Sequence, residues 1–206
     1  MANGTTRHSR ATRIAHAGLA VAVATQLATS LIMRAPRADR AGDLFFQAHS
    51  YSGLAAMAFV ALFWLVVVLR TAGTDAGLLM PWFSAPRRRA LVADLRETWA
   101  ALRSFRLPPY AEAAPFSAAI HGLGLLLMTT MAATGTFYFL TAQAGPAETG
   151  ALALAMEVHA LLANLVWAYL IGHALMALLH HYGSDHSLAE MWSLRRTPQV
   201  AGGTKK

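Results

Sequence analysis

HALLANLVWAYLIGHALMALLHHY, residues 159–182, is a continuous apolar stretch without Asp, Glu, Lys or Arg. A helix needs about 20 apolar residues to cross a bilayer, so this stretch is long enough to span one. Its residues His159 and His173 are fourteen positions apart. At about 100° per residue, fourteen steps return to within about 40° of the start and advance about 21 Å along the axis. One helix can therefore present two histidines on the same face at two depths.

Three more apolar windows accompany this one, so that the expected spans are 14–33, 44–69, 116–140 and 152–179. The first three contain no charged residue, and the fourth contains only Glu157, near its start. The chain is 56% hydrophobic and 13% charged, about half the charge expected of a soluble domain. The windows are too long for barrel strands of about 10 residues, and helices satisfy their own backbone in lipid. The sequence predicts an all-α integral membrane protein, a single domain over residues 1–206 built as a four-helix bundle.

The basic residues gather beside the expected membrane ends. Three precede the first span, three lie between the first two spans, seven lie in 70–115, none lies between the last two spans and four are in the tail. By the positive-inside rule, both termini and the 70–115 connection are cytoplasmic, while the loops 34–43 and 141–151 face outward. The formal net charge of +7 follows from this distribution. We therefore expect a multi-pass membrane protein with no nucleic-acid partner.

The 70–115 connection contains a second kind of helix. In residues 87–106, Leu91, Val92, Leu95, Trp99 and Leu102 recur at helical spacing opposite several arginines. This pattern is typical of an amphipathic helix on a membrane surface. Docking on a soluble partner is the alternative, and the lipid interpretation is the one we prefer.

Five histidines lie inside the expected spans, where ionisable residues are costly and usually functional. His49 and His159 fall at the outer level, and His16, His121 and His173 at the inner level. Two haems, each held between two histidines, fit this order, with His49 paired to His159 and His16 paired to His173. Such ligation suits electron transfer because both axial positions of the iron are filled. His121 is left over; it could replace His16, line a quinone pocket or bond a haem propionate, and we favour the roles in which it is not a ligand.

Other metal chemistry has less support in the sequence. The chain has no cysteine, which excludes thiolate-held clusters and the covalent attachment of c-type haem. Neutral imidazole also suits zinc and nickel, yet the first three spans offer no carboxylate ligand. His180, His181 and His186 lie at or beyond the inner end of the fourth span, and an interfacial position explains them as well as a propionate or quinone contact does.

The segment 159–182 strongly resembles the fourth helix of bacterial cytochrome b561, and the resemblance extends over all four expected helices. A similar di-haem fold occurs in the cytochrome b subunits of Ni/Fe-hydrogenases and formate dehydrogenases. The resemblance implies two haem b groups ligated from the first, second and fourth helices, which map onto His16, His49, His159 and His173. Two positions depart from the family: Ala17 stands where a tryptophan is common, and Ala132 where many members have a proline. Neither change removes an expected ligand.

Three functions are compatible with these residues. The resemblance implies a di-haem cytochrome that carries out outer-sphere electron transfer from an outer-side donor, with superoxide as one candidate, to ubiquinone. The alternative is an anchor subunit that relays electrons between a dehydrogenase or hydrogenase partner on the outer side and quinone. A histidine-lined metal transporter belongs to a different class and predicts no haem spectrum.

Overall fold

The long apolar windows of the sequence form the long helices of the computed structural model, which describes residues 8–37, 39–69, 75–108, 111, 114–142, 150–183 and 188–192. Four long helices run along the molecule: α1 (Arg10–Ser30), α2 (Leu44–Leu69), α5 (Pro115–Ala142) and α6 (Ala151–Gly183). The remaining elements are α3 (Ala76–Leu79), η1 (Pro81–Phe83), α4 (Ala85–Arg103) and α7 (Ala189–Trp192). The described residues contain helices and no strand, apart from one isolated bridge between Arg37 and Arg40. The fold is therefore all-α.

Three of these helices, α2, α5 and α6, are long and apolar enough to cross a membrane. Helix α1 is long enough but less apolar than these three, because it begins with Arg10 and contains Arg13 and several polar residues. Its 21 residues nevertheless give a length of about 31 Å, close to the thickness of the hydrocarbon core. The membrane helical fold is supported for three helices, and a fourth span at α1 stays a prediction.

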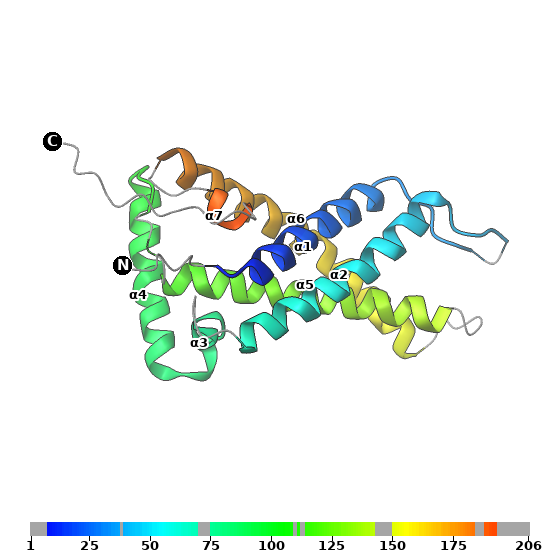
Figure 1. Ribbon diagram of the computed structural model, residues 1–206, viewed down its shortest axis with the longest axis horizontal. Coiled ribbons are helices and arrows are strands. Elements are labelled where there is room, and N and C mark those ends of the chain that lie inside the picture. Colours follow the sequence, from blue (N-terminus) through cyan, green and yellow to red (C-terminus); the bar gives the residue numbers. More distant parts are fainter. Residues whose placement is uncertain are drawn as a thin grey trace.

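The centre of the bundle is a core to which each long helix contributes. Leu27 of α1, Val60 of α2, Met128 of α5 and Val166 of α6 form one buried cluster. In a membrane, apolar side chains gain little by moving from lipid into the bundle, because lipid tails are apolar too. Close packing and hydrogen bonds between helices therefore hold such bundles together. Helix α1 packs on α2, α2 on α5, and α5 on α6. The four helices therefore lie side by side, as Figure 1 shows.

A glycine near the N-terminal end of α5 allows a close approach between elements. A Cβ atom at Gly122 would collide with the backbone carbonyl of Leu79. Leu79 belongs to α3 and is buried with Val67 of α2 and Leu125 of α5. The absence of a side chain at Gly122 thus lets α3 dock on the bundle.

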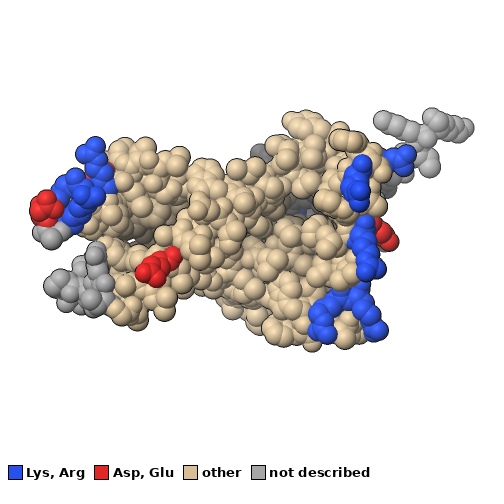
Figure 2. All heavy atoms as spheres, turned by 180° about the vertical axis from the view of Figure 1, so that it is seen from behind, with Lys and Arg blue, Asp and Glu red and all other residues tan. Residues whose placement is uncertain are grey.

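The outside of the bundle is apolar and uncharged between its two ends. Large hydrophobic side chains such as Val21, Leu65, Leu161 and Leu165 are exposed on it. Figure 2 shows the Lys, Arg, Asp and Glu side chains gathered mainly towards the two ends, with an uncharged middle. An extended apolar surface of this kind fits contact with lipid.

Helix α4 lies across the end of the bundle where the N-terminal end of α1 is found (Figure 1). Asp94 of α4 caps α5, because its Oδ2 atom accepts a hydrogen bond of 2.8 Å from the backbone N–H of Phe116. No residue of α4 is buried. The expected amphipathic segment, 87–106, thus corresponds to a surface helix that starts at Ala85 and is anchored to α5.

Some sequence-based expectations fall outside the described residues. They concern His186, most of the 141–151 loop and the terminal residues 201–206.

Candidate functional site

The bundle brings four of the five intramembrane histidines together in two pairs. The ring centres of His49 on α2 and His159 on α6 are 6.4 Å apart, with an angle of 72° between the ring planes. Those of His16 on α1 and His173 on α6 are 6.3 Å apart, with an angle of 52°. All four residues are partly buried. Helix α6 therefore contributes one member to each pair, at two depths.

These separations can be compared with a metal held in line between two imidazoles. Two metal–nitrogen bonds of about 2 Å, with each ring centre about 1.1 Å behind its nitrogen, place the ring centres roughly 6.3 Å apart. Both pairs agree with this value. The residues present therefore fit the two axial positions of a haem iron at each level.

We call His49–His159 the outer pair and His16–His173 the inner pair, after the levels expected from the sequence. The outer pair is supported on the α2 side by α1. Nδ1 of His49 lies 3.1 Å from Oγ1 of Thr29 and 3.2 Å from the backbone carbonyl oxygen of Gln26. The amide Nε2 of Gln26 also donates to the carbonyl of His49 and, at 2.8 Å, to Oγ of Ser52. Helix α1 thus holds both the backbone and the ring of His49.

The other member of the outer pair is supported by α5. Nδ1 of His159 lies 2.8 Å from Oγ1 of Thr134. A Cβ atom at Gly135 would lie 3.3 Å from Cε1 of His159, so the glycine lets the ring sit close to α5. In both outer histidines Nδ1 is engaged, which leaves Nε2 as the nitrogen for a metal.

The inner pair has aromatic neighbours in place of hydrogen-bonding ones. The ring of Tyr169 stacks on His173, with centres 5.5 Å apart and planes 11° from parallel. The ring of Trp192 on α7 meets His16 edge-on at 5.4 Å. Nδ1 of His16 is buried, and none of the described residues forms a hydrogen bond with it. A Cβ atom at Gly124 would collide with the ring of Tyr169, so this glycine lets Tyr169 reach its place.

The fifth histidine, His121 on α5, lies beside the inner pair. Its ring centre is 5.2 Å from that of His173, with the planes 89° apart. Its Nδ1 is 2.7 Å from the backbone carbonyl oxygen of Ser117, and its side chain is exposed. It is therefore closer to His173 than a metal between the two rings would require, and differs in exposure from the four paired histidines.

Sequence reasoning missed the residues that support the rings, above all Thr29, Thr134, Tyr169 and Trp192. Tyr169 precedes His173 by four residues, a spacing that places two side chains on one helix face. Thr29 and Thr134 support histidines on other helices, so no spacing within one helix indicates them. The glycines near the histidines in the sequence differ in the space beside them. Phe59 occupies the space next to Gly18, whereas nothing lies within 4 Å of a Cβ atom at Gly172.

Larger metal clusters are absent from the part of the chain that the structure describes. No group of three or more His, Cys, Asp or Glu side chains is arranged there to hold a metal ion. The histidine pairs are thus the metal-binding geometry that the described residues offer.

Comparison with known proteins places the chain in a family. The family model described as prokaryotic cytochrome b561 matches residues 7–194. No curated protein and no solved structure matches the chain. The match covers all four long helices, and the resemblance predicted from the sequence is confirmed. The chain therefore belongs to the prokaryotic cytochrome b561 family, a family of membrane cytochromes that bind haem b and transfer electrons.

Proposed function

We propose that this chain is a di-haem cytochrome that transfers electrons across the membrane between an outer-side donor and the quinone pool. His49 and His159 are the axial ligands of the outer haem, and His16 and His173 those of the inner haem. The observation that carries this proposal is the presence of two inter-helix histidine pairs with ring centres 6.4 and 6.3 Å apart.

The protein's own residues would have three tasks in this function. The paired imidazoles would hold each iron from two sides and so would exclude other ligands from it. The helix face of α6 keeps the two ligand levels about 21 Å apart along the axis. The apolar helices exclude water from both levels. Bound there, haem b supplies a one-electron carrier whose potential depends on its ligands and their surroundings.

His16, and not His121, is the proposed partner of His173. The separation between the rings of His16 and His173 is 6.3 Å, whereas that between His121 and His173 is 5.2 Å. The first value matches the roughly 6.3 Å required by two metal–imidazole bonds in line, and the second is too short. His121 is therefore proposed as a contact to quinone or to a haem propionate.

The donor side is proposed to be the loop between α1 and α2. This loop carries the exposed residues Arg34, Arg37 and Arg40 and lies at the end of the bundle away from α4. Asp39 and Asp43 of the same loop offset two of these three positive charges, and the one that remains would attract a small anionic donor such as superoxide. Ubiquinone is the proposed acceptor. An anchor subunit that receives electrons from a dehydrogenase or hydrogenase partner is the second candidate.

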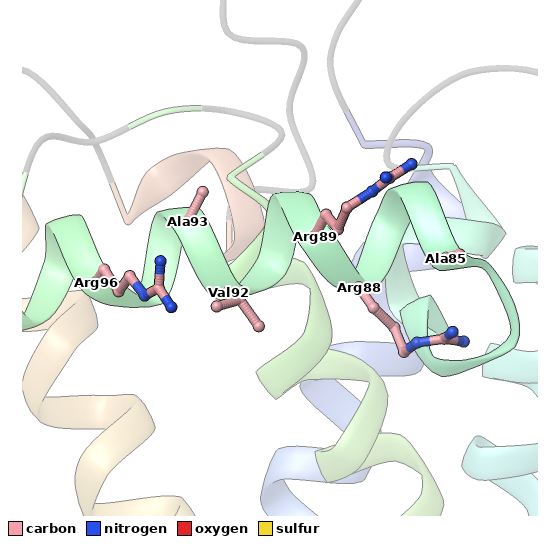
Figure 3. Close-up of a pocket in the computed structure, with 6 residues that line it drawn as sticks. All are labelled: Ala85, Arg88, Arg89, Val92, Ala93 and Arg96. Carbon is pink, nitrogen blue, oxygen red and sulfur yellow. The ribbon is translucent and has the colours of Figure 1, made fainter.

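The orientation in the inner membrane is proposed from the charges at the other end. Arg88, Arg89 and Arg96 line a groove on α4 together with Ala85, Val92 and Ala93 (Figure 3). Cytoplasmic surfaces are enriched in such residues, and anionic lipid headgroups attract them. We therefore place α4 and both termini on the cytoplasmic side, with α4 on the lipid surface.

The test of the proposal is the haem content of purified single-histidine variants. A reduced-minus-oxidised spectrum with a pyridine haemochrome assay should give two haems for the native chain. His49→Ala and His159→Ala should each lose the same haem, and His16→Ala and His173→Ala the other. Retention of both haems in all four variants would overturn the ligand assignment. Quinone reduction by the isolated chain with a small donor separates the first candidate function from the anchor subunit.

A further inference from the structure

Two threonines support the outer histidine pair, and we infer that Thr29 and Thr134 are positioning residues for its ligands. Each holds a histidine with the proton on Nδ1 and thereby makes Nε2 a stronger donor to the iron. This inference rests on the proposed function, because it assumes that His49 and His159 are ligands. It assigns a different role to each pair: the outer ligands are hydrogen-bonded, and the inner ones are not supported in this way.

The position of the proton on His49 follows from its acceptors. The hydroxyl of Thr29 donates to the backbone carbonyl of Thr25 at 2.7 Å. Its oxygen, 3.1 Å from Nδ1 of His49, is therefore left to accept. The backbone carbonyl of Gln26, at 3.2 Å from the same nitrogen, can only accept. The carbonyl of Gln26 thus requires a proton on Nδ1, the hydroxyl oxygen of Thr29 is placed to accept the same proton, and the lone pair is left on Nε2.

The same arrangement is repeated on His159 by a different helix. The hydroxyl of Thr134 donates to the backbone carbonyl of Thr130 at 2.8 Å. Its oxygen is 2.8 Å from Nδ1 of His159, and with the hydroxyl proton directed at Thr130 this oxygen is placed to accept from the ring. Thr29 of α1 therefore holds His49 of α2, and Thr134 of α5 holds His159 of α6 in the same way.

The inner pair provides the contrast within the same molecule. Nδ1 of His16 is buried, and no described residue forms a hydrogen bond with it. A hydrogen bond from the second nitrogen of a ligating histidine fixes its tautomer and raises its basicity. Stronger donors stabilise the oxidised iron more than the reduced iron, so the threonines are expected to lower the potential of the outer haem.

The test is a redox titration of the intact haem-loaded protein in detergent, followed at the haem absorption bands. Thr29→Val and Thr134→Val remove the hydroxyl oxygen while keeping the shape of the side chain. The carbonyl of Gln26 still accepts from His49 in Thr29→Val, so the smaller shift is expected there. Each should raise one midpoint potential and leave the other unchanged, with both haems bound. We expect an about tenfold change in the ratio of oxidised to reduced haem, the lower end of effects beyond the first coordination shell. For a one-electron couple this equals about 59 mV.

Matched controls come from the same two helices. Thr25 and Thr130 lie one turn before the positioning residues, and their hydroxyls bond only to the backbone carbonyls of Val21 and Leu126. Thr25→Val and Thr130→Val should therefore leave both potentials unchanged. Thr29→Ser and Thr134→Ser keep the hydroxyl and should retain the native potential. The midpoint that persists in His49→Ala identifies the inner haem.

The outcomes separate this inference from the proposed function. A native protein without haem, or His49→Ala and His159→Ala variants with both haems, would overturn the proposed ligands. Intact haems with unshifted potentials in both valine variants would overturn the role of the threonines alone, as would an equal shift in the controls. Loss of the outer haem from the valine but not the serine variants would support the positioning role.

Discussion

The choice between His16 and His121 as partner of His173 gives the most discriminating prediction. Substitution of His16 by Ala should reduce the haem content from two to one per chain, whereas His121→Ala should keep both. The two candidates differ in the distance between their ring centre and that of His173. The ring centres of His16 and His173 are 6.3 Å apart, and those of His121 and His173 are 5.2 Å apart.

The magnitude follows from these distances. A metal between two in-line imidazoles requires roughly 6.3 Å between ring centres, so an iron between His121 and His173 would need the rings to separate by about 1.1 Å. His121 would have to move away from Ser117, whose backbone carbonyl lies 2.7 Å from its Nδ1. His16 needs no such movement. The geometry therefore predicts an all-or-none difference between the two variants and no partial loss in both.

The assay is the pyridine haemochrome content per mole of purified chain, with a redox titration to count the remaining midpoints. In His121→Ala we expect two midpoints, with a change confined to the inner one or to the rate of quinone reduction. Ser117→Ala serves as a control, because His121 bonds to its backbone and not to its side chain. A His121→Ala protein with one haem, beside a His16→Ala protein with two, would refute the argument from distance.

Three further predictions concern the scaffold. Trp64→Phe removes the 2.9 Å bond from the indole Nε1 to Oγ1 of Thr129 and should cost about 0.6 kcal/mol of stability in detergent; Thr129→Val should cost the same, and adding it to Trp64→Phe should cost nothing more through this bond. The pKa of Asp43 is held below its usual value, chiefly by the backbone N–H of Phe46, so the cap on α2 should be intact at neutral pH and be lost as the pH falls through that lowered pKa; Asp43→Asn should abolish this part of the acid sensitivity in thermal unfolding. Helix α4 should show more protection from hydrogen exchange in anionic than in zwitterionic nanodiscs. Replacement of Arg88, Arg89 and Arg96 by Gln should abolish this difference. Equal protection of the native α4 in both lipids would contradict its placement on the lipid surface.

Much of the candidate site could be predicted because its signals are local. Fourteen residues between His159 and His173 fix one face and two depths, since the geometry of an α-helix depends only on its own backbone. The apolar windows likewise correspond to α2, which has the expected bounds, and to α5 and α6, which extend beyond the expected spans at both ends. The first window corresponds less closely to its helix, because α1 begins before the expected span and includes Arg10 and Arg13.

The sequence by itself determined that this chain is a helical membrane protein with histidines at two levels on one helix. Only the tertiary structure shows how the rings lie around His173, with the ring centre of His16 at 6.3 Å and that of His121 at 5.2 Å, since both histidines have the same expected depth and come from different helices. It also decided that Thr29 and Thr134 support the outer pair. Contacts between helices depend on the rotation and register of each helix against its neighbour, and no periodicity within a single helix contains that information.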